Sequence, residues 1–405
     1  MQTALALSGG GYRASVFHLG VLARLAREDQ LENVTFLSTV SGGSLVTGLV
    51  FALNGNTWPT SQQYLEKVLP AARRLFTTTD MQKSLLQSVS QNLFLLFGNR
   101  AQALSRLIQE QWGVTISVKQ LPRSPRWMIN TTCYETGKNW RFEQFRMGDY
   151  LFGYSYDTDQ VKLADAMAAS AGFPGLIGAL ELDITPMKWI EYASSVNAGD
   201  EVSDSADVIQ ARKTQPKTQL FSEKVHLWDG GVYDNHGLEG LHDFRTGWSD
   251  KFEFLLVSDA AGRGGLEHYA PGARAISRLM TGIMMNQVRS LRTRAILERI
   301  QNHADKGVFL QTGKSVNYIL NNIQRTKDNG AYIDEVLKQP GFIDQANRGT
   351  LSQVQAEQVA NFATVIRRLK ESEYQLIYQH GFETANAILS SYYPKTFKLM
   401  IDLSS

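Results

Sequence analysis

The sequence has 405 residues, of which 43% are hydrophobic and 20% charged, a composition typical of a folded globular protein. Its 41 lysines and arginines nearly balance 39 aspartates and glutamates, so it lacks the positive surplus of proteins that bind nucleic acid along their length. Cys133 is the only cysteine, which excludes an internal disulfide and a thiolate metal cluster. Arginines are dense only within residues 289–299, where a solvated helix face is the simpler interpretation.

The N-terminal segment is unlike a signal peptide, because no basic residues precede its short apolar run and glycines rather than a cleavage site follow it. No stretch reaches the roughly 18 consecutive apolar residues that a transmembrane helix needs. The sequence therefore predicts a soluble, cytoplasmic protein, with peripheral contact to a membrane as an alternative.

The first predicted elements alternate between strands and helices. An apolar run at residues 3–7 predicts a strand, and apolar residues at helical spacing predict a helix at 14–27. A second strand is predicted at 34–37 and a second helix at 44–53. Two strands joined by a helix indicate a parallel βαβ unit, and therefore an α/β fold.

Three amphipathic helices are predicted next, within residues 60–113, and we interpret this region as an inserted helical cap. Its apolar run at 93–97 is either a lid or membrane-docking face or, more simply, part of a buried helix. Strands are then predicted at 127–133 and 140–142, and a helix at 163–171.

The last third of the chain is predicted to contain few strands. Residues 194–219 are poor in large apolar side chains and are interpreted as a mobile surface loop. Strands are predicted at 225–228 and 252–257, and the second of these is the last strand expected. Residues 270–405 are expected to be a largely helical part that packs on the core.

Ser41 lies where a predicted strand meets a predicted helix, and Gly42 and Gly43 follow it. A nucleophile elbow needs this context, because its serine sits on a cramped turn that tolerates only small neighbours. The first glycine of the usual motif is replaced here by Thr39. Taken alone, Ser-Gly-Gly before a helix is equally consistent with a plain helix N-cap.

The glycine loop after the first strand contains Gly9, Gly10 and Gly11. Successive glycines allow backbone N–H groups to converge on one point, which is one way to form an anion hole. The loop also fits a loose dinucleotide fingerprint, but the second strand does not end in the acidic residue that would hold a ribose. Arg13 is a candidate anchor of this loop or of a phosphate, and the structural role is the simpler interpretation.

Asp229 follows the predicted strand at 225–228 and precedes two glycines. In isolation an Asx turn explains it better, but active sites of α/β proteins form where the carboxyl ends of strands meet. We therefore expect Asp229, Ser41 and the glycine loop to lie together. A serine nucleophile needs a base; a Ser41–Asp229 pair is the simpler arrangement, and His236 is the reserve candidate.

These segments together resemble the patatin-like phospholipases, in particular their bacterial branch, and the opening is similar to the catalytic domain of cytosolic phospholipase A2. The matching segments are Ser8 to Arg13, Val40 to Ser44, Asn130 to Thr132, Trp140 to Phe142, Ala168 to Pro174, Asp229 to Gly231, and the tail residues Leu376, Ile377, Gly381 and Phe382. They span most of the chain in the family's order.

The resemblance implies a three-layer α/β/α sandwich with a mainly parallel central sheet and an inserted helical cap, in a single domain of residues 1–405. It also implies a Ser41–Asp229 dyad without histidine, and no metal or nucleotide cofactor. The implied oxyanion hole is formed by Gly9, Gly10, Gly11 and Gly42. The implied substrates are fatty acyl esters of phospholipids or lysophospholipids.

We therefore predict a serine acyl-ester hydrolase of the phospholipase A or lysophospholipase type, in which Ser41 forms an acyl-enzyme intermediate. Three alternatives stay open: a catalytically silent lipid-binding scaffold on the same fold, an acyltransferase in which another alcohol replaces water, and a nucleotide-binding oxidoreductase. A fluorophosphonate probe that fails to label Ser41 would favour the scaffold, and dinucleotide titration would expose the oxidoreductase.

Overall fold

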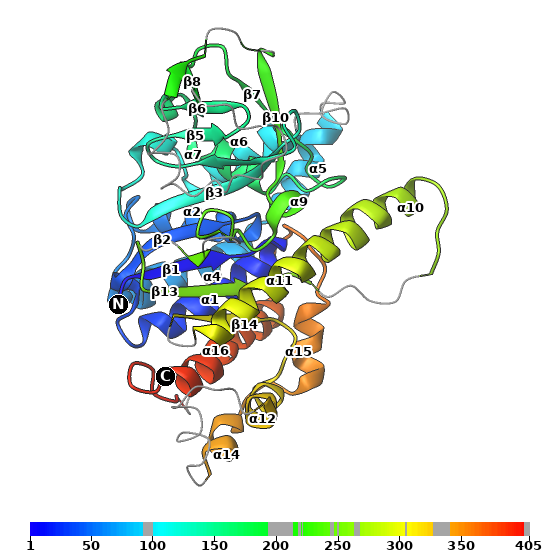
Figure 1. The fold of residues 1–405 in the computed structure, drawn as a ribbon. Helices are drawn as coiled ribbons and strands as arrows, with labels where there is room; N and C mark the ends of the chain where they lie inside the picture. The colour runs from blue at the N-terminus through cyan, green and yellow to red at the C-terminus, as the bar shows by residue number, and fades with distance from the viewer. Residues whose placement is uncertain are drawn as a thin grey trace.

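The computed structural model describes residues 1–91, 100–192, 214–217, 220, 222–243, 247–248, 251–262, 268–303, 306–326 and 341–400. In this part of the chain twelve strands form one sheet that lies between layers of helices (Figure 1). Two short strands, β11 (His242–Asp243) and β12 (Gly247–Trp248), pair separately. The predicted α/β class with three layers is confirmed.

Five parallel strands form one half of the sheet. In spatial order they are β14 (Gly307–Gln311), β13 (Phe254–Asp259), β1 (Thr3–Leu7), β2 (Val34–Thr39) and β3 (Arg126–Cys133). At the centre of this group, Leu5 of β1 lies opposite Leu256 on one side and Leu37 on the other. Near-continuous apolar runs are typical of strands covered on both faces, which is why β1 and most of its neighbours could be predicted.

Beyond β3 the sheet continues as an antiparallel extension. It contains β4 (Asn139–Phe142), β5 (Met147–Asp149), β6 (Gly153–Ser155), β8 (Trp189–Tyr192) and β9 (Thr214–Pro216), and a branch in which β10 (Lys224–Asp229) pairs with β3 and with β7 (Leu180–Asp183). The prediction of a mainly parallel sheet is thus confirmed for the five strands around β1. Strands β5 to β9 were not predicted, because three or four residues are too few to show an alternating pattern.

Alternate residues of β1 point into two cores, one on each face of the sheet. Leu5 and Leu7 belong to the larger core, and Ala4 and Ala6 to the smaller one. Helices α1 (Gly11–Ala26), α2 (Gly42–Leu53), α7 (Leu163–Ser170) and α16 (Glu371–Tyr392) pack into the larger core. Helix α11 (Met285–Asn302) covers the smaller core with Ile296 and Ile300.

Helices α1 and α16 approach closely enough for their backbones to touch. A β-carbon on Gly20 of α1 would collide with the carbonyl of Tyr378, and one on Gly381 of α16 with the carbonyl of Phe17. Every residue of α1 is buried. The C-terminal helix α16 is therefore part of the same packed layer as the first helix of the chain (Figure 1).

The described elements within residues 60–113 are helices. They are α3 (Ser61–Gln63), the π-helical segment η2 (Tyr64–Val68), α4 (Leu69–Thr78), α5 (Met81–Gln91) and α6 (Arg100–Trp112). The predicted apolar run at 93–97 lies outside the described residues. Of the predicted loop at 194–219, the structure describes little besides β9.

The expectation that no strand follows residue 257 is wrong, because β14 extends the parallel sheet next to β13. Its five residues are flanked by helices, so the sequence pattern favours a helical interpretation of the whole segment. The remaining helical elements are α9 (Gly231–Asp234), α10 (Ala273–Ser277), the π-helical segment η6 (Arg278–Met284), α12 (Val316–Thr326), α14 (Phe342–Asn347), α15 (Gln353–Ala360), and the short η1 (Leu31–Asn33), η4 (Val118–Gln120) and η5 (Thr158–Gln160). None of the described helices combines the length and the apolar character that crossing a bilayer would require.

Candidate active site

Ser41 and Asp229 are brought together because β2 and β10 meet end to end along the same side of β3. Thr39, the last residue of β2, pairs with Ile129, and Asp229, the last residue of β10, pairs with Thr131 two positions farther along. β2 runs parallel to β3 and β10 runs antiparallel, so their carboxyl ends face each other. The sequence predicted that Ser41 and Asp229 lie together because both would follow parallel strands that end at the same edge of the sheet. In the structure they lie together because β2 and β10 run in opposite directions and their ends face each other.

Ser41 is held in a strained turn at the start of α2. Its backbone has φ 50° and ψ −115°, a region that residues with a side chain rarely occupy. The two glycines that follow are required by space, since a β-carbon on Gly42 would collide with the carbonyl of Gly11, and one on Gly43 with the carbonyl of Leu7. This is the geometry of a nucleophile elbow, with the side chain 6% exposed.

Asp229 is a buried carboxylate beside this serine, only 2% exposed. One of its oxygens, Oδ1, accepts a hydrogen bond from the Gly231 N–H at 2.7 Å. Burial raises the pKa of Asp229 from 3.8 to about 7, although the Gly231 N–H and the hydroxyl of Ser41 act in the opposite direction. A carboxylate with a pKa near 7 is a much stronger base than an ordinary aspartate, which suits it to accept the proton of a hydroxyl.

The amide groups for an anion hole lie at the N-termini of α1 and α2, which approach each other at Gly11 and Gly42. Among the described residues, no hydrogen-bond acceptor is found for the N–H groups of Gly10, Gly11 and Gly42. Two helix dipoles and three free N–H groups at one place favour a negative charge there. The Gly9 N–H, in contrast, donates to the carbonyl of Asn235 at 3.2 Å, which corrects the prediction that Gly9 contributes a donor.

The glycine loop is held in place by His18 of α1, a residue for which the sequence predicted no role. Its Nε2 lies 3.0 Å from the carbonyl oxygen of Ser8, and its Nδ1 lies 2.9 Å from the hydroxyl of Ser258. The Ser8 hydroxyl in turn accepts the Ala260 N–H at 2.8 Å. These bonds attach the start of the loop to the end of β13. Burial lowers the pKa of His18 to about 4, so the ring is neutral at pH 7.

We predict that His18 makes the protein less stable in acid. The pKa of His18 is about 4 in the folded protein and 6.5 ordinarily, so between these values the unfolded chain binds a proton that the folded protein does not. The free energy of unfolding is therefore highest above pH 6.5 and falls by up to about 3 kcal/mol as the pH drops towards 4. His18→Gln should cost about 1–3 kcal/mol at pH 8 through the lost hydrogen bonds, and should remove this acid slope. Urea unfolding of the wild type and the variant from pH 8 to pH 4 measures this difference. If the free energies of unfolding of the two proteins fell equally with pH, His18 would not be the cause of the acid sensitivity.

Arg13 binds the two segments that flank the glycine loop. Its Nε donates to the carbonyl of Ala260 at 3.1 Å, and its guanidinium also bonds the carbonyl of Phe362. Burial, with the charge of Arg289 nearby, lowers the pKa of Arg13 to about 10. These contacts are those of a structural anchor, although the side chain also borders the cavity at Ser41.

The arginines of α11 do not form the solvated face that the sequence suggested. Arg289 pairs with Asp259 at 2.9 Å and bonds the carbonyl of Gly262, and Arg292 pairs with Glu239 at 2.7 Å. These two side chains point inward and fix the helix to the sheet. The prediction of one solvated face is wrong for them because it took no account of the acidic partners.

His236, the reserve candidate for the base, lies elsewhere. It is completely buried, with Nε2 3.5 Å from Asp259 and 3.4 Å from the hydroxyl of Thr293. It does not line the cavity at Ser41. The only carboxylate with a contact to Ser41 among the described residues is Asp229.

The elbow is supported by a cluster of hydroxyl groups. Thr39, which replaces the usual glycine, bonds the Ser44 hydroxyl at 2.8 Å and accepts the indole N–H of Trp127 at 2.8 Å. Ser170 of α7 accepts the Ser41 N–H at 3.0 Å, bonds Ser44 at 2.8 Å and donates to Asn130 at 2.7 Å. The sequence predicted no role for Ser170, which lies within the matching segment Ala168 to Pro174.

We predict that Ser170→Ala lowers turnover by about tenfold to a hundredfold with a smaller change in KM. The substitution leaves the buried Ser41 N–H without an acceptor, which costs about 1–3 kcal/mol and loosens the elbow. The matched control is Ser391→Ala, since in the part of the chain that the structure describes this buried hydroxyl bonds only the carbonyl of Ala387, at 2.7 Å in α16. Steady-state kinetics and urea unfolding separate the two effects. Equal kinetics for both variants would contradict the role of Ser170.

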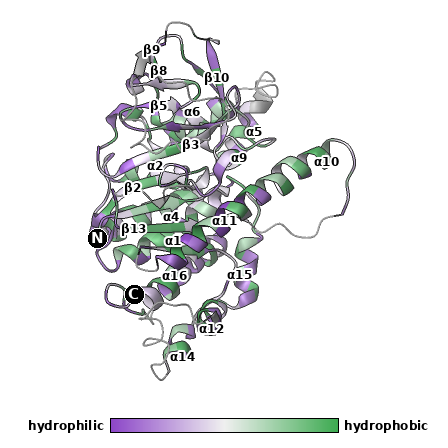
Figure 2. Cartoon of the chain, in the orientation of Figure 1, coloured by the Kyte–Doolittle hydropathy of each residue, from purple (hydrophilic) through white to green (hydrophobic). Residues whose placement is uncertain are grey.

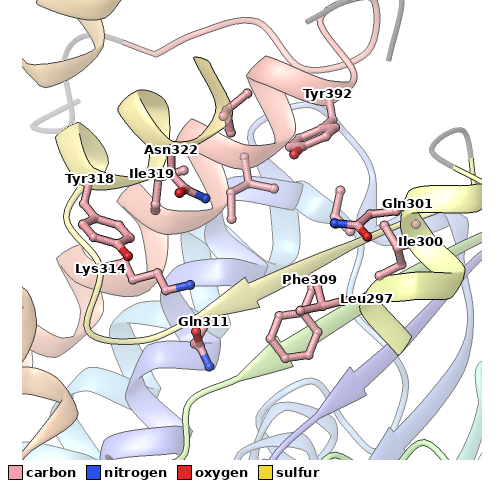
Figure 3. A pocket seen from close by; sticks show the side chains of 14 residues that line it. Leu297, Ile300, Gln301, Phe309, Gln311, Lys314, Tyr318, Ile319, Asn322 and Tyr392 are labelled. Carbon is pink, nitrogen blue, oxygen red and sulfur yellow. The ribbon is translucent and has the colours of Figure 1, made fainter. Parts of the chain in front are cut away.

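A cavity of about 200 Å³ opens at Ser41 and Asp229. Its lining comprises Gly9, Gly10, Arg13, Ser41, Phe173, Asp229, Asn235, Ala261, Gly262, Thr281, Met285, Asn286, Arg289 and Thr364. A second cavity of about 230 Å³ lies between β14, α11, α12 and α16, with Phe309, Lys314 and Tyr318 in its wall (Figure 3). It contains neither Ser41 nor Asp229, so the first cavity is the candidate site. Among the described residues, no group of three His, Cys, Asp or Glu side chains could hold a metal ion.

Comparisons with known proteins identify the family of the chain and similar folds. The model of a protein family described as patatin-like phospholipase matches residues 5–242. None of the curated proteins matches the sequence significantly. Human GIVD cytosolic phospholipase A2 is similar in structure, with a TM-score of 0.51 and 14% identity, and the match covers 97% of this chain but 60% of that one. The same protein in complex with methyl gamma-linolenyl fluorophosphonate gives a TM-score of 0.46 and 15% identity, over 97% of this chain and 59% of that one.

Proposed function

Since the chain belongs to the patatin-like phospholipase family of lipid acyl hydrolases, we propose that it cleaves fatty acyl esters of phospholipids or lysophospholipids with Ser41 as nucleophile and Asp229 as base. The observation that supports this most strongly is the end-to-end meeting of β2 and β10, which places a strained serine against a carboxylate with a pKa of about 7. No histidine is needed for this chemistry.

In the first half of the reaction, Asp229 accepts the proton of the Ser41 hydroxyl while the oxygen bonds to the ester carbonyl carbon. The carbonyl oxygen becomes an oxyanion, which the N–H groups of Gly10, Gly11 and Gly42 stabilise. The bond to the leaving alcohol then breaks, and Asp229 donates the proton that it took from Ser41 to the departing oxygen. The acyl group stays on Ser41 as an ester.

In the second half, Asp229 accepts a proton from water as the water oxygen attacks the acyl carbon. The bond to the Ser41 oxygen breaks, Ser41 regains its proton from Asp229, and the fatty acid leaves. Asp229 thus acts as a base and then as an acid in each half. A pKa near 7 suits both roles, because the group is neither strongly basic nor strongly acidic at neutral pH.

The test is lipid mass spectrometry after incubation of the purified protein, and of its Ser41→Ala variant, with a mixed phospholipid extract. We expect free fatty acids and matching lysolipids from the wild type only, and the lysolipid identifies the acyl position. Transfer of the acyl group to an added alcohol, in preference to water, would replace hydrolase by acyltransferase. A folded wild type that releases nothing and is not labelled by a fluorophosphonate would favour the silent scaffold.

A further inference from the structure

One long helix of the protein packs against the body with its C-terminal half and projects from it with its N-terminal half. Segments α10, η6 and α11 follow each other without a break, and their N-terminal half projects from the sheet (Figure 1). No residue of α10 or η6 is buried, and in α11 the first buried residue is Ile296. More than five turns of helix are therefore exposed or only half-buried among the described residues.

The exposed half has a stripe of large apolar side chains, which we call the apolar stripe. It consists of Ile276, Leu279, Met280, Ile283, Met284, Val288 and Leu291, with exposed fractions from 37% to 61%. These residues recur every three or four positions, so they lie along one side of the helix. Figure 2 shows hydrophobic segments, in green, recurring along this part of the helix. Single exposed apolar residues are common on proteins, but a continuous row of this size usually marks a binding surface.

Before Glu298, which lies near the C-terminal end of α11, the charged residues of this helix are all positive. From residue 268 to residue 297 the sequence contains five arginines and no aspartate or glutamate. Arg289 and Arg292 bind acidic partners of the body, whereas Arg274 and Arg294 are exposed. An apolar face bordered by arginine is the composition of helices that lie in the surface of an anionic membrane.

The helix also connects the apolar stripe to the cavity at Ser41. Thr281, Met285, Asn286 and Arg289 line that cavity, and they alternate along the helix with stripe residues. An α-helix with its side chains is about 10 Å across. A lipid surface in contact with the stripe would therefore lie about one helix diameter from the dyad.

We propose that the apolar stripe is a membrane-docking surface that inserts into the interface of an anionic lipid bilayer. Binding to the bilayer does not depend on catalysis, but its purpose, to bring the cavity to its substrate, rests on the proposed function. A second copy of the chain is a poorer partner, because pairing two such helices would bring their arginines together without acidic residues to offset them.

The experiment is flotation of the full chain with vesicles, in a Ser41→Ala background so that the lipid stays intact. Vesicles of phosphatidylcholine mixed with phosphatidylglycerol are compared with vesicles of phosphatidylcholine alone. The test variant is Ile276→Ser/Met280→Ser/Met284→Ser. The matched control is Leu151→Ser/Val354→Ser, which changes two equally exposed apolar residues on other surfaces, 54% and 65% exposed.

We expect the parent and the matched control to float with the anionic vesicles, and the test variant to bind at least about a hundredfold more weakly, because three inserted side chains are lost. Binding of the parent should also weaken in high salt and with neutral vesicles. A parent that does not bind, or a test variant that binds like the parent, would overturn the proposal. So would a parent that is a dimer by light scattering and becomes monomeric in the test variant without binding vesicles.

Hydrolysis of a soluble short-chain ester, measured with Ser41 intact, separates this proposal from the proposed function. The stripe residues are outside the cavity lining, so the test variant should cleave the soluble ester at the wild-type rate while losing activity on vesicles. A wild type that floats with vesicles but never cleaves either ester would refute the proposed function and leave the docking surface standing.

Discussion

Replacing Ser41 by alanine should reduce acyl-ester hydrolysis by on the order of a millionfold, the effect known for the nucleophile of other serine hydrolases. The hydroxyl is the only atom lost, and the strained backbone at φ 50° stays the same, so folding stability should change by less than about 1 kcal/mol. The measurement is turnover on a phospholipid and on a soluble ester, with thermal unfolding as the check on the fold.

The matched control for this variant is Ser44→Ala, which removes a buried hydroxyl three residues away. Because Ser44 bonds Thr39 and Ser170 and no further side chain among the described residues, we expect at most about a tenfold loss of turnover. A fluorophosphonate should label the wild type and Ser44→Ala at Ser41, and should leave Ser41→Ala unlabelled. Substantial residual activity in Ser41→Ala would show that another residue is the nucleophile.

Asp229→Asn should lower turnover by about ten-thousandfold, because the amide cannot accept the proton of Ser41. The oxygen that receives the Gly231 N–H is preserved, so the site keeps its shape. In the wild type, activity should rise as the pH increases through 7, where Asp229 loses its proton. Initial rates from pH 5 to pH 9 measure both effects, and a rate independent of pH across 7 would contradict Asp229 as the base.

The same substitution should make the protein more stable. Between pH 4 and pH 7 the folded wild type retains a proton on Asp229 that the unfolded chain releases, so its stability decreases as the pH rises towards 7. Above pH 7 Asp229 is charged in the folded protein as well, and burying this charge lowers the free energy of unfolding by about 2–4 kcal/mol. The neutral asparagine avoids this cost. We expect the difference in urea unfolding free energy to grow from pH 4 to pH 7 and then level off. A less stable variant at pH 8 would mean that burial does not penalise this carboxylate.

The proximity of Ser41 and Asp229 could be predicted because each of these residues lies in a short local motif. Ser41 and Asp229 both follow an apolar strand and precede two glycines, and such signals depend on neighbours in sequence. The direction of β10 could not be predicted, since it is set by pairing with β3, about a hundred residues earlier in the chain. The two residues were expected to meet at one sheet edge, and they meet where two opposed strands end.

The supporting residues could not be predicted for the same physical reason. Ser170 binds the Ser41 N–H across 129 residues of sequence, and His18 binds Ser258 across 240. A lone serine or histidine in an apolar helix gives no sign of such a partner. The Gly9 amide was assigned to the anion hole by its motif alone, and only the backbone of Asn235 shows that it is occupied.

The order of the strands also determines when, during synthesis, the enzyme can first act. The ribosome makes β1 and the glycine loop before the other described elements, and β13, the neighbour of β1, follows about 250 residues later. The carbonyl of Phe362 that anchors Arg13, and helix α16 against α1, come later still. At about 5–20 residues per second, the two ends of the site are separated by tens of seconds. A nascent chain therefore emerges with Ser41 long before β13, α16 and the contacts of Arg13 exist, so the cavity at Ser41 cannot form until these later segments have been made.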